Sequence, residues 1–396
     1  MARLYGLAFL AGTAVGIWYF LPYFIIDLEG GIMAVGLVSA APTLASALVQ
    51  LAVGTVLDAT RAPKTLLVMG FLLSAGSATL FLAASTAWAV ILVATVTEVF
   101  NAITITWGVA NSIYITELTP ARSRARIMAG YSSAWYVGNI VGSVVAGVLA
   151  PRSWGAVFLV FAGMNLAAGI FMKYGLPDAP VSVEPPGYRR ITRALFDARS
   201  FLAVARRVPT LMRGAPPAFA AFCFALSIRS VGVSMVTPLT AVYLADVLHA
   251  SKPVIAAVTS VGTAARIVPG PLIGWIADRW GRKKVFLTGL ILMTVYPFLY
   301  ISARDVPLLY PAAVMMGVGW ACTQATFLAW QMELIPRQRG TFTGLLSFVN
   351  TLSWALGPLL GGVLGEYAGL WWGVGVATLA ELLGLSILIR VPEKTT

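Results

Sequence analysis

Residues 274–284 read Gly-Trp-Ile-Ala-Asp-Arg-Trp-Gly-Arg-Lys-Lys and stand between two long apolar runs. The runs begin near Val254 and Val285, and each is close to the roughly 20 residues that a helix needs to cross the hydrocarbon core of a bilayer. Strands that cross a bilayer are about half as long and alternate in polarity, so runs of this length predict helices. The stretch therefore predicts a tight connection between two transmembrane helices.

The alternation of apolar run and polar connection extends over the whole chain. Of its 396 residues, 59% are hydrophobic and 11% are charged, and the mean hydropathy is +0.86. Soluble domains carry about 25% charged residues, so this composition excludes a soluble globular protein. It predicts an all-α polytopic membrane protein with twelve transmembrane helices. The predicted spans begin near Leu4, Met33, Thr65, Trp88, Ile127, Trp154, Phe219, Val254, Val285, Leu308, Phe342 and Trp371.

The basic residues gather on one side of the predicted membrane. If the N-terminus is cytoplasmic, most arginines and lysines fall in cytoplasmic connections, and the opposite side holds only Arg152, Lys252 and Arg304. This asymmetry is the positive-inside pattern. It predicts a multi-pass protein of the cell (inner) membrane with both termini in the cytoplasm. The net charge of +12 is then a topology signal, and we expect no nucleic-acid partner.

The chain contains an internal repeat. The pattern Gly-x-x-x-Asp at 54–58 recurs 220 positions later at 274–278. The pattern Glu-Leu-x-Pro at 117–120 recurs 216 positions later at 333–336. A period of this length predicts two parallel six-helix halves, with sites at their interface.

The predicted halves are residues 1–176 and 217–396, joined by a basic linker at 177–216. The linker opens with prolines, which favour an extended chain. Apolar residues then alternate with arginines at helical spacing, which predicts an amphipathic helix at the inner membrane surface. A solvated basic linker is the alternative.

The motifs at these positions resemble those of the major facilitator superfamily. Residues 274–283 resemble the loop signature that this family carries between helices two and three, and often between eight and nine. The two Glu-x-x-Pro connections and Gly-Pro-x-x-Gly-Gly at 357–362 are similar as well. The resemblance covers residues 4–390. It implies two pseudo-symmetric six-helix bundles, alternating access to a central cavity, and a monomer in the lipid bilayer.

The resemblance also implies a cytoplasmic gate. In the family this loop latches the cytoplasmic side shut, with an acidic residue set against a helix N-terminus and nearby arginines. In the first half Arg61, Ala62 and Pro63 replace the later glycine and basic residues of the signature, so the first loop departs from the family pattern at these positions. Simple turn chemistry is the alternative for both loops. The candidate gate residues are Gly54, Asp58, Arg126, Gly274, Asp278, Arg279, Gly281, Arg282 and Arg339.

Four ionisable residues lie well inside predicted spans, namely Glu98, Arg229, Arg266 and Glu381. A charge at mid-membrane costs roughly 2.5–3.5 kcal/mol on insertion scales, so each needs a reason. The first three have uncharged partners at the repeat offsets. The repeats therefore predict the scaffold, and these asymmetric charges are candidates for the chemistry. Glu381 is expected to be internal to the second half.

Glu98 belongs to a polar stripe at helical spacing that includes Asn101 and Asn111. Such a stripe on a membrane helix indicates a water-filled cavity or a helix contact. Our hypothesis is that Glu98 exchanges a proton during transport and pairs, in one state, with Arg229 or Arg266. A static ion pair is one alternative, and arginines that bind an anionic substrate are another.

Aromatic and amide side chains complete the predicted substrate cavity. Rings that combine an apolar face with a polar tip suit an amphipathic ligand, although lipid-facing positions are an alternative for each. The candidates are Tyr19, Tyr23, Asn101, Asn111, Trp135, Asn139, Gln324, Asn350 and Trp354.

Several motifs are absent from the sequence. It has no Gly-x-x-x-x-Gly-Lys-Ser/Thr loop, no metal-spaced group of Cys and His, and no nucleophile–base constellation. We therefore expect no enzyme activity, no cofactor and no metal. The short chain, the aromatic content and the acidic residue in the first half resemble drug–proton antiporters. This resemblance favours a secondary transporter that exports an amphipathic drug-like compound or metabolite in exchange for protons. Proton-coupled uptake or exchange of an organic anion or sugar is the alternative. A non-transporting receptor or an intramembrane enzyme would be a different class.

Overall fold

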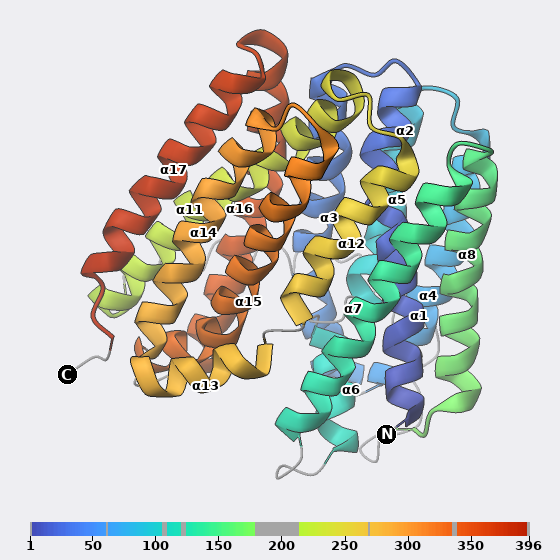
Figure 1. The fold of residues 1–396 in the computed structure, drawn as a ribbon. Helices are drawn as coiled ribbons and strands as arrows, with labels where there is room; N and C mark the ends of the chain where they lie inside the picture. Colours follow the sequence, from blue (N-terminus) through green and yellow to red (C-terminus); the bar gives the residue numbers. More distant parts are fainter. Residues whose placement is uncertain are drawn as a thin grey trace. The chain divides into compact units, whose positions relative to one another are not determined.

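The computed structural model describes residues 2–60, 62–104, 109–119, 124–178, 214–267, 270–334 and 339–393. These ranges form helices and turns, with no β-strand among them (Figure 1). The α-helices are α1 Ala2–Trp18, α2 Leu21–Asp27, α3 Ile32–Thr60, α4 Pro63–Ala78, α5 Ala87–Thr104, α6 Val109–Leu118, α7 Arg124–Leu149, α8 Trp154–Ile170, α11 Pro217–Val242, α12 Lys252–Ile267, α13 Gly270–Trp280, α14 Arg282–Ser302, α15 Leu309–Leu334, α16 Arg339–Tyr367 and α17 Leu370–Arg390. The short helical segments are η1 Thr79–Ala83, η2 Phe171–Gly175, η3 Tyr243–Val247 and η4 Val306–Leu308.

Eleven helical segments of the described chain are long and apolar enough to cross a membrane. The predicted all-α polytopic architecture is confirmed. The difference from twelve lies at the span expected from Val254. There α12 has 16 residues, and α13 begins at Gly270 after two residues outside the described ranges.

The chain divides into two compact units. Unit 1 comprises residues 1–21 and 41–206, and unit 2 comprises residues 22–40 and 207–396. Helix α3 therefore contributes its first residues to unit 2 and the remainder to unit 1. The domain limits expected from the repeat stay a prediction. Residues 179–213, which include the predicted amphipathic helix, lie outside the described residues.

Glycines bring the backbones of α1 and α7 together in unit 1. A Cβ atom added at Gly12 would lie 2.0 Å from the Trp135 carbonyl oxygen, and one at Gly142 would lie 2.0 Å from the Thr13 carbonyl oxygen. No side chain fits at such distances, so the two helices touch through their main chains. Close approach through small residues is how membrane helices associate where lipid offers no hydrophobic driving force.

Unit 2 uses the same device around α11. A Cβ atom at Gly361 of α16 would lie 2.2 Å from the Met235 carbonyl oxygen. One at Gly384 of α17 would lie 2.6 Å from the Ala225 carbonyl oxygen. Helices α1 and α11 begin their respective repeats, and α7 and α16 are the fifth spans. The close contact between the first and fifth spans is therefore common to both units.

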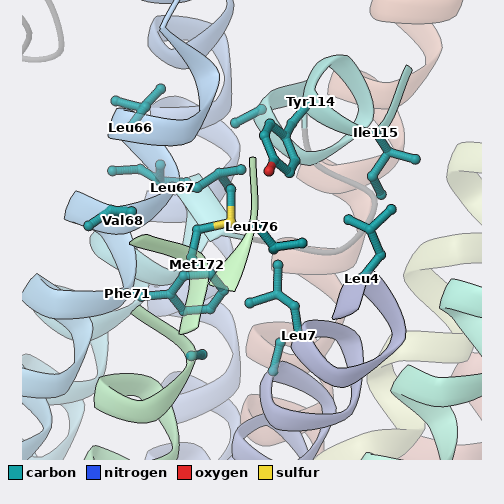
Figure 2. Packing of buried hydrophobic residues seen from close by; sticks show 14 of the residues in the cluster. Leu4, Leu7, Leu66, Leu67, Val68, Phe71, Tyr114, Ile115, Met172 and Leu176 are labelled. Carbon is teal, nitrogen blue, oxygen red and sulfur yellow. The ribbon is translucent and has the colours of Figure 1, made fainter. Parts of the chain in front are cut away.

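The end of α8 is fastened into the core of unit 1. The Tyr114 hydroxyl group donates to the Pro177 carbonyl oxygen at 2.7 Å. The Lys64 ammonium group donates to the Leu176 carbonyl oxygen at 2.8 Å and lies 2.9 Å from Asp178. Figure 2 shows the buried residues around this point. They include Leu4, Leu7, Leu66, Leu67, Val68, Phe71, Ile115 and Met172.

Unit 2 fastens the end of α17 in a matching way. The Trp330 indole N–H donates to the Pro392 carbonyl oxygen at 3.2 Å. The Lys283 ammonium group donates to the Ile389 and Val391 carbonyl oxygens, each at 2.6 Å. Trp330 stands 216 positions after the tyrosine that does the same in unit 1. We call these two arrangements the end clamps of the units.

Candidate functional site

For most of the gate residues, the structure describes the position on a helix but not the side chain. The structure places Gly54, Asp58, Arg126, Gly274, Asp278 and Arg339 on α3, α7, α13 and α16 without describing their side chains. The Arg279 guanidinium group lies 3.9 Å from the centre of the Trp275 ring. Gly281 alone separates α13 from α14, which begins at Arg282, and its φ of +97° favours glycine. The gate role stays a prediction.

Unit 1 contains a pocket of about 190 Å³. It is bounded by α1, α4, α5, α7 and α8, and most of its lining is apolar or aromatic. The lining residues are Ala11, Ala14, Val15, Trp18, Phe71, Glu98, Asn101, Thr104, Trp135, Phe161 and Asn165.

Glu98 is the ionisable residue among those lining residues. Its carboxylate oxygen accepts a hydrogen bond from the Asn101 amide at 3.3 Å, and Ser46 is a second partner. Asn101 in turn accepts from the Ser74 hydroxyl group at 2.5 Å. The carboxyl group is therefore held in place by neutral side chains, in a pocket whose described lining carries no basic group. A proton or a cationic ligand is what such a group can bind.

The other cavity candidates of this unit fall into two groups. Asn101 and Trp135 line the pocket together with Glu98. Asn111 instead donates to a main-chain carbonyl oxygen of α5 at 2.7 Å, and Asn139 is buried with an amide nitrogen that has no hydrogen-bond partner. Tyr19 follows α1 and is 44% exposed. The polar stripe is thus only partly a pocket surface, because Asn111 joins α6 to α5.

Unit 2 contains a smaller pocket of about 70 Å³ with a more polar lining. The lining includes the cavity candidates Gln324, Asn350 and Trp354, whereas Tyr23 is buried on α2 outside it. The lining residues are Leu226, Arg229, Ser230, Phe286, Trp320, Thr323, Gln324, Phe327, Asn350 and Trp354.

Arg229 is the charged residue of that lining, and it is 6% exposed. One terminal nitrogen contacts the Met293 sulfur atom at 2.8 Å, and its Nε has no hydrogen-bond partner. The neighbouring Ser230 hydroxyl group donates to the Asn350 amide oxygen at 2.8 Å. A thioether is a weak acceptor, so this guanidinium group is poorly satisfied for a buried charge.

Arg266 lies behind the aromatic part of the same pocket. Its guanidinium carbon is 5.0 Å from the centre of the Trp320 ring, and a terminal nitrogen is 3.8 Å from the Met316 sulfur atom. Trp320 packs edge-to-face on Trp354, with ring centroids 5.7 Å apart. Cation–π contact of this kind stabilises a charge by about 0.5–2 kcal/mol. Arg266 therefore contacts a residue of the pocket lining, Trp320, and is not itself part of that lining.

The sequence predicts that Glu381 lies inside the second half, but it does not predict which residues surround it. Glu381 is 1% exposed on α17, both of its carboxyl oxygens lack hydrogen-bond partners, and it acts electrostatically on Arg229. The two residues are far apart in the sequence, and no spacing rule relates α11 to α17. The sequence offers one indication of this contact, which is that the two residues carry opposite charges and belong to the same predicted half. Glu98 belongs to unit 1 and the two arginines belong to unit 2, so their predicted pairing stays a prediction.

Comparisons with known proteins agree with the helical architecture. The sequence profile of the Major Facilitator Superfamily matches residues 4–239 and 218–396. The chain is 30% identical over 124 residues to the chloramphenicol resistance protein CraA of Acinetobacter baumannii, covering 31% of this chain and 30% of that protein. It is 24% identical over 173 residues to multidrug resistance protein 1 of Bacillus subtilis, covering 43% of this chain and 44% of that protein. The chain spans about a fifth to less than half of the length of the curated relatives it matches.

Two solved structures share the fold. The nucleoside transporter NupG has a TM-score of 0.73 at 16% identity, covering 98% of this chain and 97% of the other. A POT family transporter in complex with 5-aminolevulinic acid has a TM-score of 0.76 at 12% identity, covering 100% of this chain and 96% of the other. At these identities the likeness concerns the fold alone.

Proposed function

The chain belongs to the Major Facilitator Superfamily, and on that premise we propose that it exports amphipathic small molecules in exchange for protons. Transport proceeds by alternating access in the cell membrane, with the two units as the moving halves and the α13–α14 connection as part of the cytoplasmic gate. The drug-resistance names of the matched relatives support export of a drug-like compound or metabolite.

One observation carries this proposal, and it is the position of Glu98 in an apolar, aromatic pocket. A ligand with an apolar body can bury it against Trp18, Trp135 and Phe161, and a cationic group on that ligand can face the carboxylate. An aromatic lining also favours cations through the ring quadrupole.

The carboxyl group of Glu98 can bind a proton or a cationic ligand in turn. An uncompensated carboxylate in the membrane costs about 2.5–3.5 kcal/mol, so the group holds either a proton or a cation. When the cationic ligand binds, the proton leaves, and when the ligand leaves, a proton returns. If the two events occur on opposite sides of the membrane, the result is antiport.

A second candidate function has its own observation. Arg229 lines the pocket of unit 2 with Asn350 and Gln324, and these donors suit an anionic or hydroxylated ligand. Proton-coupled uptake or exchange of an organic anion or sugar is therefore the alternative.

The test uses the purified full chain in liposomes that enclose a pH-sensitive dye. A panel of lipophilic cations, organic anions and sugars is added under an imposed pH gradient. Wild type should move protons in response to cations, and Glu98→Gln should lower this flux at least tenfold. Asp305→Asn, which removes a carboxylate from an exposed turn, is the matched control. A response to anions or sugars alone, or one that Glu98→Gln retains, contradicts the proposal.

A further inference from the structure

We propose that the pocket of unit 2 binds a carboxylate group at Arg229, and that Glu381 is the buried counter-ion that takes up a proton when the carboxylate binds. This inference adds to the proposed function an anion subsite with its own proton linkage. It rests on membership of a transporter family and does not depend on the role of Glu98.

The size and lining of the pocket suit a small anionic head. A cavity needs about 10–15 Å³ to hold one water molecule, so about 70 Å³ admits a group of a few heavy atoms. Asn350, Gln324 and Ser230 provide polar atoms on its wall, and Trp320 and Trp354 provide an aromatic face. A carboxylate attached to an apolar or aromatic body matches this combination.

Arg229 lacks the partner that such a head would supply. Its side chain is buried, its one recorded contact through a terminal nitrogen is to the Met293 sulfur atom, and its Nε is unpaired. A guanidinium group presents five N–H donors in a planar fork that matches a carboxylate with two parallel hydrogen bonds. The carboxylate of a ligand in the pocket would therefore supply strong acceptors to N–H donors that the protein leaves without them.

Glu381 lies against Arg229 because glycines make room for both side chains. A Cβ atom at Gly232 of α11 would lie 2.8 Å from the Glu381 Cγ atom. A Cβ atom at Gly384 of α17 would lie 2.7 Å from the Arg229 Cβ atom. Each helix thus offers a glycine to the charged residue of the other. This reciprocal arrangement places two opposite charges in one helix interface.

The two charges are close but not locked together. The ion pairs within 4.0 Å that the structure records among described residues do not include Glu381 with Arg229. The Thr294 hydroxyl group lies beside the Glu381 carboxyl group and donates to the Leu290 carbonyl oxygen at 2.9 Å. The carboxyl group therefore stabilises Arg229 through space, with no ion pair within 4.0 Å to hold it in the ionised form.

The other groups around Glu381 leave this role open. Tyr296 of α14 acts electrostatically on Glu381 and on both arginines, including Arg266 of α12. Glu366 of α16, which also packs against α17, accepts from the Met33 backbone N–H at 3.2 Å. Arg229 is thus the described cation that acts directly on Glu381.

Proton uptake follows from charge balance. Without ligand, the arginine cation and the Glu381 carboxylate sum to zero. A bound carboxylate would leave the interior with one net negative charge, which is costly in a membrane. When Glu381 takes one proton from water and becomes a neutral carboxylic acid, the sum returns to zero. Anion binding is therefore linked to uptake of about one proton per site.

The experiment is titration calorimetry on the purified full chain in detergent. Benzoate is the probe, and neutral benzamide is its matched control. Each titration is repeated in buffers of different ionisation enthalpy, so that the buffer dependence of the heat gives the number of protons taken up. Wild type should bind benzoate more tightly than benzamide, with uptake of about one proton.

Three variants assign the two roles. Arg229→Gln should weaken benzoate binding at least tenfold, since it removes the charged donor. Glu381→Gln should bind benzoate with no proton uptake. Arg304→Gln, which removes an exposed arginine from the same unit, should match wild type. Thermal unfolding verifies that each variant is folded.

Several results would overturn the inference. They are equal binding of benzoate and benzamide, unchanged benzoate affinity in Arg229→Gln, and proton uptake that persists in Glu381→Gln. If Glu381→Gln fails to fold, wild type decides alone, because heats without buffer dependence exclude the linkage. Failure here leaves the cation-driven flux through Glu98 untouched. Loss of that flux likewise leaves benzoate binding and its proton uptake intact, so the two proposals fail separately.

Discussion

The pockets of the two units differ in charge although they occupy related helices. The pocket of unit 1 is larger and apolar around the carboxyl group of Glu98, and that of unit 2 is smaller and polar around the guanidinium group of Arg229. Thr104 and Trp320 stand at the same repeat position, 216 residues apart, and each lines the pocket of its unit. The larger side chain, tryptophan, thus stands in the smaller pocket. The helices were kept through the repeat while the pocket walls diverged.

The two units share the same contacts between their helices. Both join their first and fifth spans through glycines, and both hold the end of the last helix with an end clamp. A repeat that keeps its backbone contacts can change the side chains that line its cavity, because the cavity carries little of the packing. Experiments on the shared scaffold and on the divergent pockets should therefore give different patterns.

The largest effect is expected where the backbones touch. Gly142→Leu in unit 1 and Gly361→Leu in unit 2 each place a side chain within about 2 Å of a carbonyl oxygen of the facing helix. Overpacking typically costs about 1–3 kcal/mol and occasionally more, and a clash with a main chain, which cannot rotate away as a side chain does, falls at the upper end. Both variants should lose most of their folded yield and unfold at lower temperature in detergent.

Glycines in open positions are the controls for that prediction. A Cβ atom at Gly163 of α8 or at Gly375 of α17 meets nothing within 4 Å. Gly163→Leu and Gly375→Leu should keep the wild-type yield. If all four variants unfold alike, the contacts between first and fifth spans are not what holds the units together.

The end clamps should give the next largest effect. Lys64→Met and Lys283→Met remove charge-assisted hydrogen bonds, each of which contributes about 1.5–3 kcal/mol. We expect the greater loss in Lys283→Met, because Lys283 holds two carbonyl oxygens, whereas Lys64 holds one and an exposed Asp178. The measurement is the unfolding temperature, with the exposed Lys284→Met as control. Equal unfolding temperatures for Lys283→Met and Lys284→Met would contradict the stabilising role of the end clamp.

The smallest effect concerns the support of Glu98. Ser74→Ala removes the hydroxyl group that holds Asn101, which in turn donates to Glu98. One hydrogen bond contributes about 0.5–1.5 kcal/mol, so the affinity for a lipophilic cation should fall about 2- to 10-fold. Ser77→Ala, one turn away, removes a buried hydroxyl group that bonds a backbone carbonyl oxygen. The measurement is the equilibrium affinity for the cation. The same loss of affinity in Ser74→Ala and Ser77→Ala would show that Ser74 has no specific role in supporting Glu98.

The sequence predicts the spans and the charges well, for a physical reason. Apolar runs are necessary for any helix in lipid, and an intramembrane charge is too costly to occur without a role. Glu98, Arg229 and Glu381 could therefore be found from their positions alone. The predicted span near Val254 is the one that does not reach membrane-crossing length in the described chain, because α12 has 16 residues.

The contacts between helices could not be predicted in the same way. The proximity of Arg229 to Glu381 depends on how α11 packs on α17, and the reciprocal glycines are visible only once that packing is known. The end clamps could not be predicted from the sequence, because the donor is a tyrosine in one unit and a tryptophan in the other. Their acceptors are main-chain carbonyl oxygens, which no residue type marks.

The most direct test of the central claim is the number of protons released when a cation binds. Tetraphenylphosphonium is added to the purified full chain in weakly buffered detergent solution, and the change in pH is recorded. The account predicts release of about one proton per bound cation in wild type and none in Glu98→Gln. Binding without release in wild type, or equal release from the Glu98→Gln variant, would contradict it.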